Sequence, residues 1–252
     1  MAMDLELEQK VLLITGGSSG LGEALAMRLV REHARVAIMA RDPERLAAST
    51  KTLCEAGGEV LEHAGDVKRP EDLERFVAAV TDRWGRIDGV VNNAGELAAG
   101  AFAEHDDAIW EEDLALKLMA AVRLTRLALP ALRSQGGAVL NTLAISGKAP
   151  DAFTTPTSVS RAAGLALTKA LSRELAPEGI RVNAVLIGVI ESGQMQRRAE
   201  QAGITPQAYY EQMVSAVGIP LGRVGRPAEF ADLASFLLSP RAAYVTGTAI
   251  NL

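Results

Sequence analysis

A glycine-rich segment near the start of the chain has the composition of a phosphate-binding loop. It runs from Thr15 to Gly22, reads Thr-Gly-Gly-Ser-Ser-Gly-Leu-Gly, directly follows an apolar run and opens a helical pattern. Glycine lets the backbone turn tightly and approach a pyrophosphate, whose charge is then stabilised by the N-terminus of the following helix. We therefore expect a dinucleotide cradle whose contacts are Gly16, Ser18, Ser19, Gly20, Leu21 and Gly22.

Short apolar runs alternate with longer amphipathic stretches along the whole chain. The expected strands are residues 11–15, 35–40, 60–64, 89–92, 138–143, 181–186 and 248–252, and the expected helices are 20–33, 43–56, 70–84, 107–134, 158–176 and 227–238. Several runs are apolar throughout, as in strands buried on both faces of a parallel sheet. The alternation predicts an α/β fold, namely a single Rossmann-type, doubly wound parallel sheet of about seven strands flanked by helices. We expect one domain over residues 1–252.

The least regular segment covers about residues 188–219, which are rich in Gln, Gly and Met. Ligands of such sheets bind beyond the carboxyl ends of the strands, where this segment follows the sixth expected strand. We therefore expect a substrate lid here. A surface excursion without a gating role is the alternative.

Charge and composition exclude several kinds of partner. The chain has 26 basic and 31 acidic residues, a net charge of −5 and no run of like charge, whereas nucleic-acid-binding domains usually carry a basic patch. The N-terminus lacks a signal-peptide pattern, and no apolar run reaches the roughly 20 residues needed to span a bilayer. Cys54 is the only cysteine, so we expect a cytoplasmic protein without nucleic-acid or membrane partners. His33, His63 and His105 lie apart in the sequence, and no metal site is expected.

Three further motifs follow the glycine-rich segment in order. They are Asp66-Val67, Asn92-Asn93-Ala94-Gly95 and Arg181-Val182-Asn183-Ala184-Val185. With these motifs the chain resembles the short-chain dehydrogenase/reductase family over essentially its whole length. The resemblance implies an NAD(P)-dependent oxidoreductase that acts on a carbonyl or alcohol group of a small-molecule substrate.

The resemblance also implies which residues surround the dinucleotide. These are Asp66 and Val67 at the adenine, Asn92, Asn93, Ala94 and Gly95 behind the cofactor, and Gly188, Ile190 and Ser192 around the carboxamide. One departure is Ile187, which stands where the family usually has proline.

The end of the second expected strand bears on the choice between NAD and NADP. An acidic residue there would bind the ribose 2′-hydroxyl and repel a 2′-phosphate. This chain has Ala40 followed by Arg41, and a guanidinium suits phosphate through charge-assisted hydrogen bonds. We therefore expect NADP, with NAD as the less favoured cofactor. The alternative role for Arg41 is an ion pair with Asp42 or Glu44.

The four catalytic positions of the family hold unusual residues in this chain. The resemblance implies an asparagine, a serine, a tyrosine and a lysine at positions that here hold Lys117, Ala144, Thr157 and Arg161. A threonine hydroxyl is far less acidic than a tyrosine hydroxyl, whose pKa is about 10. Arg161 stays protonated, although it can hold the nicotinamide ribose or pair with an oxyanion. The family's usual proton transfer therefore cannot operate with these residues.

Lys117 is the best candidate for a replacement proton donor. A lysine close to another cation can have its pKa lowered into a working range. In this hypothesis Lys117 is the acid or an electrostatic anchor, Arg161 tunes it, and Ser146, Thr157 or Ser158 positions the substrate oxygen. The alternative is a solvated or interface lysine on a long helix.

Two functions remain open at the level of the sequence. One is an NADP-dependent oxidoreductase with a non-standard proton donor, and the other is a non-catalytic NADP(H)-binding or scaffold protein. The resemblance further implies self-association, as a homotetramer or next a dimer, through the expected helices 107–134 and 158–176.

Overall fold

One parallel sheet runs through the computed structural model, which describes residues 3–252. Within these residues seven strands are arranged in the order β3-β2-β1-β4-β5-β6-β7. Their bounds are β1 (Val11–Thr15), β2 (Arg35–Ala40), β3 (Glu59–Ala64), β4 (Gly89–Asn92), β5 (Ala138–Ala144), β6 (Arg181–Ile187) and β7 (Ala249–Asn251). The order reverses between β1 and β4, and such a point is where doubly wound sheets bind ligands. The predicted α/β class and sheet are confirmed.

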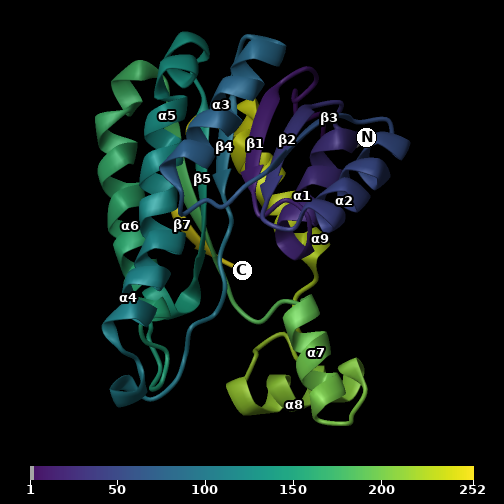
Figure 1. The fold of residues 1–252 in the computed structure, drawn as a ribbon, viewed down its shortest axis with the longest axis vertical. Helices are drawn as coiled ribbons and strands as arrows, with labels where there is room; N and C mark the ends of the chain where they lie inside the picture. The colour runs from purple at the N-terminus through teal and green to yellow at the C-terminus, as the bar shows by residue number, and fades with distance from the viewer. Residues whose placement is uncertain (1–2) are drawn as a thin grey trace.

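Helices cover both faces of the sheet (Figure 1). Their bounds are α1 (Gly20–Arg31), α2 (Pro43–Glu55), α3 (Pro70–Trp84), α4 (Asp107–Leu114), α5 (Ala120–Gln135), α6 (Thr157–Glu174), α7 (Gly193–Gln201), α8 (Pro206–Val217) and α9 (Pro227–Leu238). Helices α1, α2 and α9 pack on one face, and α3, α5 and α6 pack on the other. In the part of the chain described, no helix is long and apolar enough to cross a membrane.

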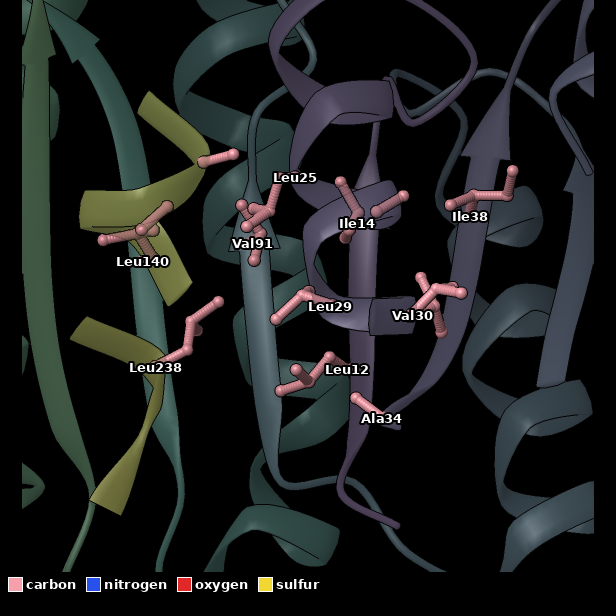
Figure 2. Close-up of a cluster of buried hydrophobic side chains, with 14 of the residues drawn as sticks. Leu12, Ile14, Leu25, Leu29, Val30, Ala34, Ile38, Val91, Leu140 and Leu238 are labelled. Atoms are coloured by element: carbon pink, nitrogen blue, oxygen red, sulfur yellow. The ribbon is translucent and has the colours of Figure 1, made fainter. Parts of the chain in front are cut away.

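The side chains of β1 show why the sheet is buried on both faces. Leu12 and Ile14 point into the core beneath α1, whereas Val11 and Leu13 point into the core beneath α3 and α5. This alternation follows from the two-residue period of a strand. Figure 2 shows Leu12 and Ile14 among side chains of α1, β2 and β4. Both faces of this central strand are therefore buried in an apolar core.

Residues 107–134 differ from the single helix predicted for them. Helix α4 ends at Leu114, a π-helical turn spans Ala115–Met119, and α5 continues from Ala120. The wider turn contains Lys117, which is buried. Turns of this kind inside helices are rare and frequently occur at functional sites.

Residues 188–219 are more regular than their composition indicated, since they contain α7 and α8. Both helices begin at a side-chain cap: the hydroxyl of Ser192 accepts a hydrogen bond from the Met195 amide, and that of Thr205 accepts one from the Ala208 amide. In Figure 1 the two helices lie together at one end of the molecule, apart from those that cover the sheet.

Candidate active site

The glycine-rich loop connects β1 to α1 in a close turn. A side chain at Gly22 would collide with the carbonyl oxygen of Gly16, so the first turn of α1 packs against the loop only because residue 22 is glycine. The amide of Gly16 donates to the carbonyl oxygen of Met39 on β2 at 2.8 Å. The loop is thus fixed at the carboxyl edge of the sheet, where β1 and β4 meet.

Asn93 holds this loop from the end of β4. Its amide nitrogen Nδ2 donates to the carbonyl oxygens of Thr15 at 3.0 Å and Gly16 at 3.2 Å. The hydroxyl of Thr15 in turn accepts hydrogen bonds from the backbone amides of Asn93 and Ala94. Asn92 points the other way, and its Nδ2 donates to Asn141 Oδ1 at 2.8 Å. Asn93 therefore braces the backbone of the cradle, whereas Asn92 joins β4 to β5.

The N-terminus of α1 faces this cradle without a side-chain cap. Ser19 is the N-cap residue, but its hydroxyl makes no capping hydrogen bond, and Ser18 beside it is buried. Leu21 is half-buried within the first turn. A helix N-terminus attracts anions through its free N–H groups. Together with the close approach at Gly22, this geometry fits a bound dinucleotide.

Arg41 and Asp66, which we expect at the adenosine end of the cofactor, follow β2 and β3. Arg41 is 53% exposed and pairs with Glu96, which follows β4, rather than with Asp42 or Glu44. Asp66 accepts a hydrogen bond from the amide of Lys68 at 2.9 Å, and Val67 is buried. The ion pair of Arg41 therefore joins the edges of β2 and β4 across the carboxyl end of β1.

The residues expected near the carboxamide follow β6. The amide of Gly188 donates to the carbonyl oxygen of Leu252 at 2.8 Å. Ile190 is buried and forms an isolated parallel bridge with Gly225. Ser192 caps α7, a role that the sequence prediction did not include.

Lys117 and Thr157 meet although forty positions separate them in the sequence. The ammonium Nζ of Lys117 donates to the hydroxyl of Thr157 at 2.7 Å. It also forms an ion pair with the carboxylate of Asp113, one helical turn earlier. The side chain of Lys117 is 1% exposed, so the alternative of a solvated lysine does not match its position.

The hydroxyl of Thr157 has a full set of partners. It donates to the carbonyl oxygen of Ala98 at 2.7 Å and accepts from the amide of Ala98 at 3.0 Å, in addition to the bond from Lys117. These contacts fasten the connection after β4 to the first residue of α6. Thr157 therefore accepts the hydrogen bond from Lys117 and holds Ala98 in place, and its own proton is used in the bond to the Ala98 carbonyl.

Arg161 lies one helical turn after Thr157 and is buried against the cradle. Its Nη1 donates to the carbonyl oxygen of Thr142 at 2.9 Å. A side chain at Gly95 would come within 2.6 Å of its Nη2, so the glycine makes room for the guanidinium. The Nε–H of Arg161 is buried and has no acceptor among residues 3–252.

Burial changes the acidity of both cations. Burial lowers the pKa of Lys117, and the charge of Arg161 lowers it further, whereas the carboxylate of Asp113 acts in the opposite direction. Burial lowers the pKa of Arg161 to about 10, which leaves it charged at neutral pH. The site therefore combines a lysine of reduced pKa with a permanent positive charge.

Ala144 and two neighbouring serines lie at the end of β5 and the start of α6. Ala144 ends β5 and offers no side-chain hydrogen bond, as expected. Ser146 follows it in a short 3-10 turn, and Ser158 is buried in the first turn of α6. Sequence reasoning omitted Asp113, whose spacing of four residues from Lys117 was an available signal.

Comparisons with known proteins agree with this geometry. A family model described as "Enoyl-(Acyl carrier protein) reductase" matches residues 16–252. A curated relative, the 3-oxoacyl-acyl-carrier-protein reductase of Thermotoga maritima, is 30% identical over 249 residues, with 98% of each chain covered.

Two solved structures are similar over nearly the whole chain. L-sorbose reductase from Gluconobacter frateurii, complexed with NADPH and L-sorbose, is 33% identical with a TM-score of 0.94, covering 99% of this chain and 97% of the other. A short-chain oxidoreductase from Pseudomonas aeruginosa PAO1, described as containing an atypical catalytic center, is 36% identical with a TM-score of 0.93, covering 98% and 96%. The chain therefore belongs to the short-chain dehydrogenase/reductase family of NAD(P)-dependent oxidoreductases.

Proposed function

We propose that the protein reduces a carbonyl group of a small molecule with NADPH, or oxidises the corresponding alcohol with NADP, and that Lys117 is its proton donor. One observation carries the proposal: Nζ of Lys117 lies 2.7 Å from the hydroxyl oxygen of Thr157 at the start of α6. Arg161 follows one turn later on the same helix and lies against Gly95 of the cradle. The cationic pair thus lies beside the cofactor site.

The hydrogen bonds of the two side chains favour Lys117 over Thr157 as the proton donor. The single hydroxyl proton of Thr157 is directed at Ala98. The ammonium of Lys117 has three N–H groups, of which one is directed at Asp113 and one at Thr157. The third is left for a substrate oxygen.

The residues of the chain divide the work of carbonyl reduction. When bound, NADPH supplies the hydride to the carbonyl carbon. Lys117 donates a proton to the carbonyl oxygen, and Arg161 stabilises the negative charge that develops on it. Because Lys117 is buried, a substrate oxygen reaches its ammonium only when neighbouring groups move.

The preference for NADP is supported at the end of β2. Arg41 is exposed there, and no acidic residue stands at Ala40 to repel a 2′-phosphate. The similar sorbose reductase was solved with NADPH, and so was the oxidoreductase from P. aeruginosa. These relatives are enzymes, so the alternative of a non-catalytic binding or scaffold protein is not favoured.

The segment 188–219 is proposed as a lid within one domain of residues 1–252. A cavity of about 350 Å³ opens between α8 and the following loop, and residues lining it include Glu191, Tyr210, Val214 and Arg223. Glu191 follows Ile190, which we expect at the carboxamide. Movement of α8 would therefore change the space next to the reacting groups.

Self-association and location complete the proposal. Met119 and Val159 are exposed apolar residues at the start of α5 and on α6, which supports pairing of these helices between subunits in a homotetramer or dimer. Light scattering after size exclusion gives the subunit number. Cys54 is free, which is compatible with the cytoplasm.

Replacing Lys117 tests the proposed chemistry. NADPH oxidation is measured with a panel of ketones, aldehydes and ketoacyl thioesters for the wild type, K117A and the control K51A, which changes an exposed lysine of α2. Positioned general acids contribute roughly 10²- to 10⁴-fold to rate, so we expect a loss of kcat in this range for K117A and none for K51A.

Cofactor binding must be measured beside turnover. We expect the Kd for NADPH to be nearly equal in the three proteins, since Lys117 lies outside the expected cofactor contacts. Wild-type turnover in K117A would overturn the role of Lys117. Binding of NADPH by the wild type without turnover on any substrate would overturn the proposed activity.

A further inference from the structure

A buried carboxylate lies next to the proposed proton donor and has no part in the reaction described so far. Asp113 belongs to the last turn of α4, and its side chain is 2% exposed. Its Oδ1 accepts from Lys117 and lies 3.4 Å from the hydroxyl of Thr157. Its Oδ2 is also buried and has no hydrogen-bond partner in the described chain.

The partners of Asp113 differ from those of the other buried aspartates. Asp72 accepts a hydrogen bond from the amide of Asp66, and Asp88 accepts one from the amide of Val11, so both stabilise local backbone. Between residues 3 and 252, Asp113 accepts from no backbone N–H. All its polar contacts are with groups of the candidate active site, although such burial normally requires full hydrogen bonding.

The helix geometry brings the carboxylate and the ammonium together. Asp113 precedes Lys117 by four residues, which is the favourable order for an acid and a base on a helix. The π-helical turn between Ala115 and Met119 carries Lys117 into the interior. A lysine drawn into the interior in this way would lose its proton more readily than one in water.

Charges from three elements act on the ammonium. Arg161 on α6 lowers the pKa of Lys117, in the same direction as burial, whereas Asp113 and Glu96, in the connection after β4, act in the opposite direction. Asp113 is the one among them that bonds the ammonium directly. It is therefore the main group that can offset burial.

We propose that Asp113 is a positioning residue that holds the ammonium of Lys117 charged and directed at the substrate oxygen. The proposal rests on the proposed function. In carbonyl reduction the N–H bond of Lys117 breaks, an O–H bond forms on the substrate, and hydride from NADPH forms the new C–H bond. The neutral amine then regains a proton from water, and Asp113 neither gives nor takes a proton in this step.

The sign of the pH dependence follows from this role. Reduction needs the charged form of Lys117, so kcat falls as the pH rises through the pKa of that lysine. Asp113 favours the charged form, and its removal lowers the pKa of Lys117. In D113N the falling limb of the kcat profile must therefore move to lower pH.

The experiment compares pH profiles of kcat for the wild type, D113N, D113E and the control D107N. Asp107 is an exposed residue of the same helix, so D107N removes the same charge without touching Lys117. We expect the limb to move to lower pH in D113N, to stay in place in D107N and to return towards the wild type in D113E. Unchanged NADPH affinity verifies that the cradle is intact.

The outcomes separate this proposal from the proposed function. If K117A loses turnover while D113N keeps the wild-type profile, Asp113 has no positioning role. If K117A keeps its turnover, the proposed donor itself is wrong. If D113N does not fold, the double variant D113N/K117M decides: a folded double variant supports charge compensation by Asp113, and an unfolded one overturns the proposal.

Discussion

At the scale of residues, the proposed roles of the side chains in the candidate site differ from those usual in the family. Thr157, one of three residues that could position the substrate oxygen, accepts a hydrogen bond from an N–H group of Lys117. Arg161 provides positive charge, because its pKa of about 10 keeps it cationic at neutral pH. In the proposed function, Arg161 keeps the electrostatic stabilisation and Lys117 donates the proton from the π-helical turn before α5.

Replacing Arg41 should change the affinity for NADPH but not the affinity for NADH. Hydrogen bonds to charged groups contribute about 1.5–3 kcal/mol, so R41A should weaken NADPH binding by roughly 10- to 100-fold and leave NADH binding unchanged. Fluorescence titration of both cofactors measures the two Kd values. An equal loss for NADH and NADPH would contradict recognition of the 2′-phosphate by Arg41.

Replacing Glu96 should have the opposite effect on NADPH affinity. Its carboxylate pairs with Arg41 in this structure and would compete with a bound phosphate. Exposed ion pairs are weak, so E96Q should tighten NADPH binding by a few-fold at most, again without effect on NADH. Weaker NADPH binding in E96Q would show that the carboxylate aids the cofactor rather than competing with it.

At the scale of elements, the connection after β4 and the start of α6 are joined through one hydroxyl. Both the amide and the carbonyl of Ala98 bond the side chain of Thr157. The same hydroxyl accepts a hydrogen bond from Lys117. The stability of this connection and the position of the Lys117 ammonium are therefore linked.

Removing that hydroxyl should destabilise the protein. T157V keeps the shape of the side chain and leaves both groups of Ala98 without their partner, which costs about 1–3 kcal/mol. Urea unfolding of T157V, T157S and the control T81V measures the change. Thr81 is exposed, so T81V should lie within about 0.5 kcal/mol of the wild type. Equal stability of T157V and the wild type would show that the contact is not formed in solution.

Elements with a strong local pattern could be predicted from the sequence, and those set by tertiary packing could not. The apolar run at Val11–Thr15 and the proline-led starts at Pro70 and Pro227 matched the structure at their boundaries. The π-helical turn left no signal in residues 107–134 because it depends on packing against α6. Capping by Ser192 and Thr205 was also missed, in a segment whose polar composition suggested a loop.

At the scale of the whole molecule, the site depends on the order of the strands. The strand order reverses between β1 and β4, so the glycine-rich loop, the end of β4 and the start of α6 meet at one edge. Motif order in the sequence indicated this meeting. The spacing of Asp113 and Lys117 could have indicated their contact, whereas the burial of the pair could not be predicted, because it requires α4 to pack against α6.

The central claim is that Lys117 donates the proton, and the pH dependence of kcat in carbonyl reduction tests it most directly. Burial lowers the pKa of Lys117, so the wild type should lose turnover as the pH rises through a value below that of an ordinary lysine. K117M should turn over slowly and lack this limb, while any fall near pH 10 from Arg161 remains. If K117M showed the same fall of kcat with rising pH as the wild type, and the wild-type kcat at lower pH, the account would be contradicted.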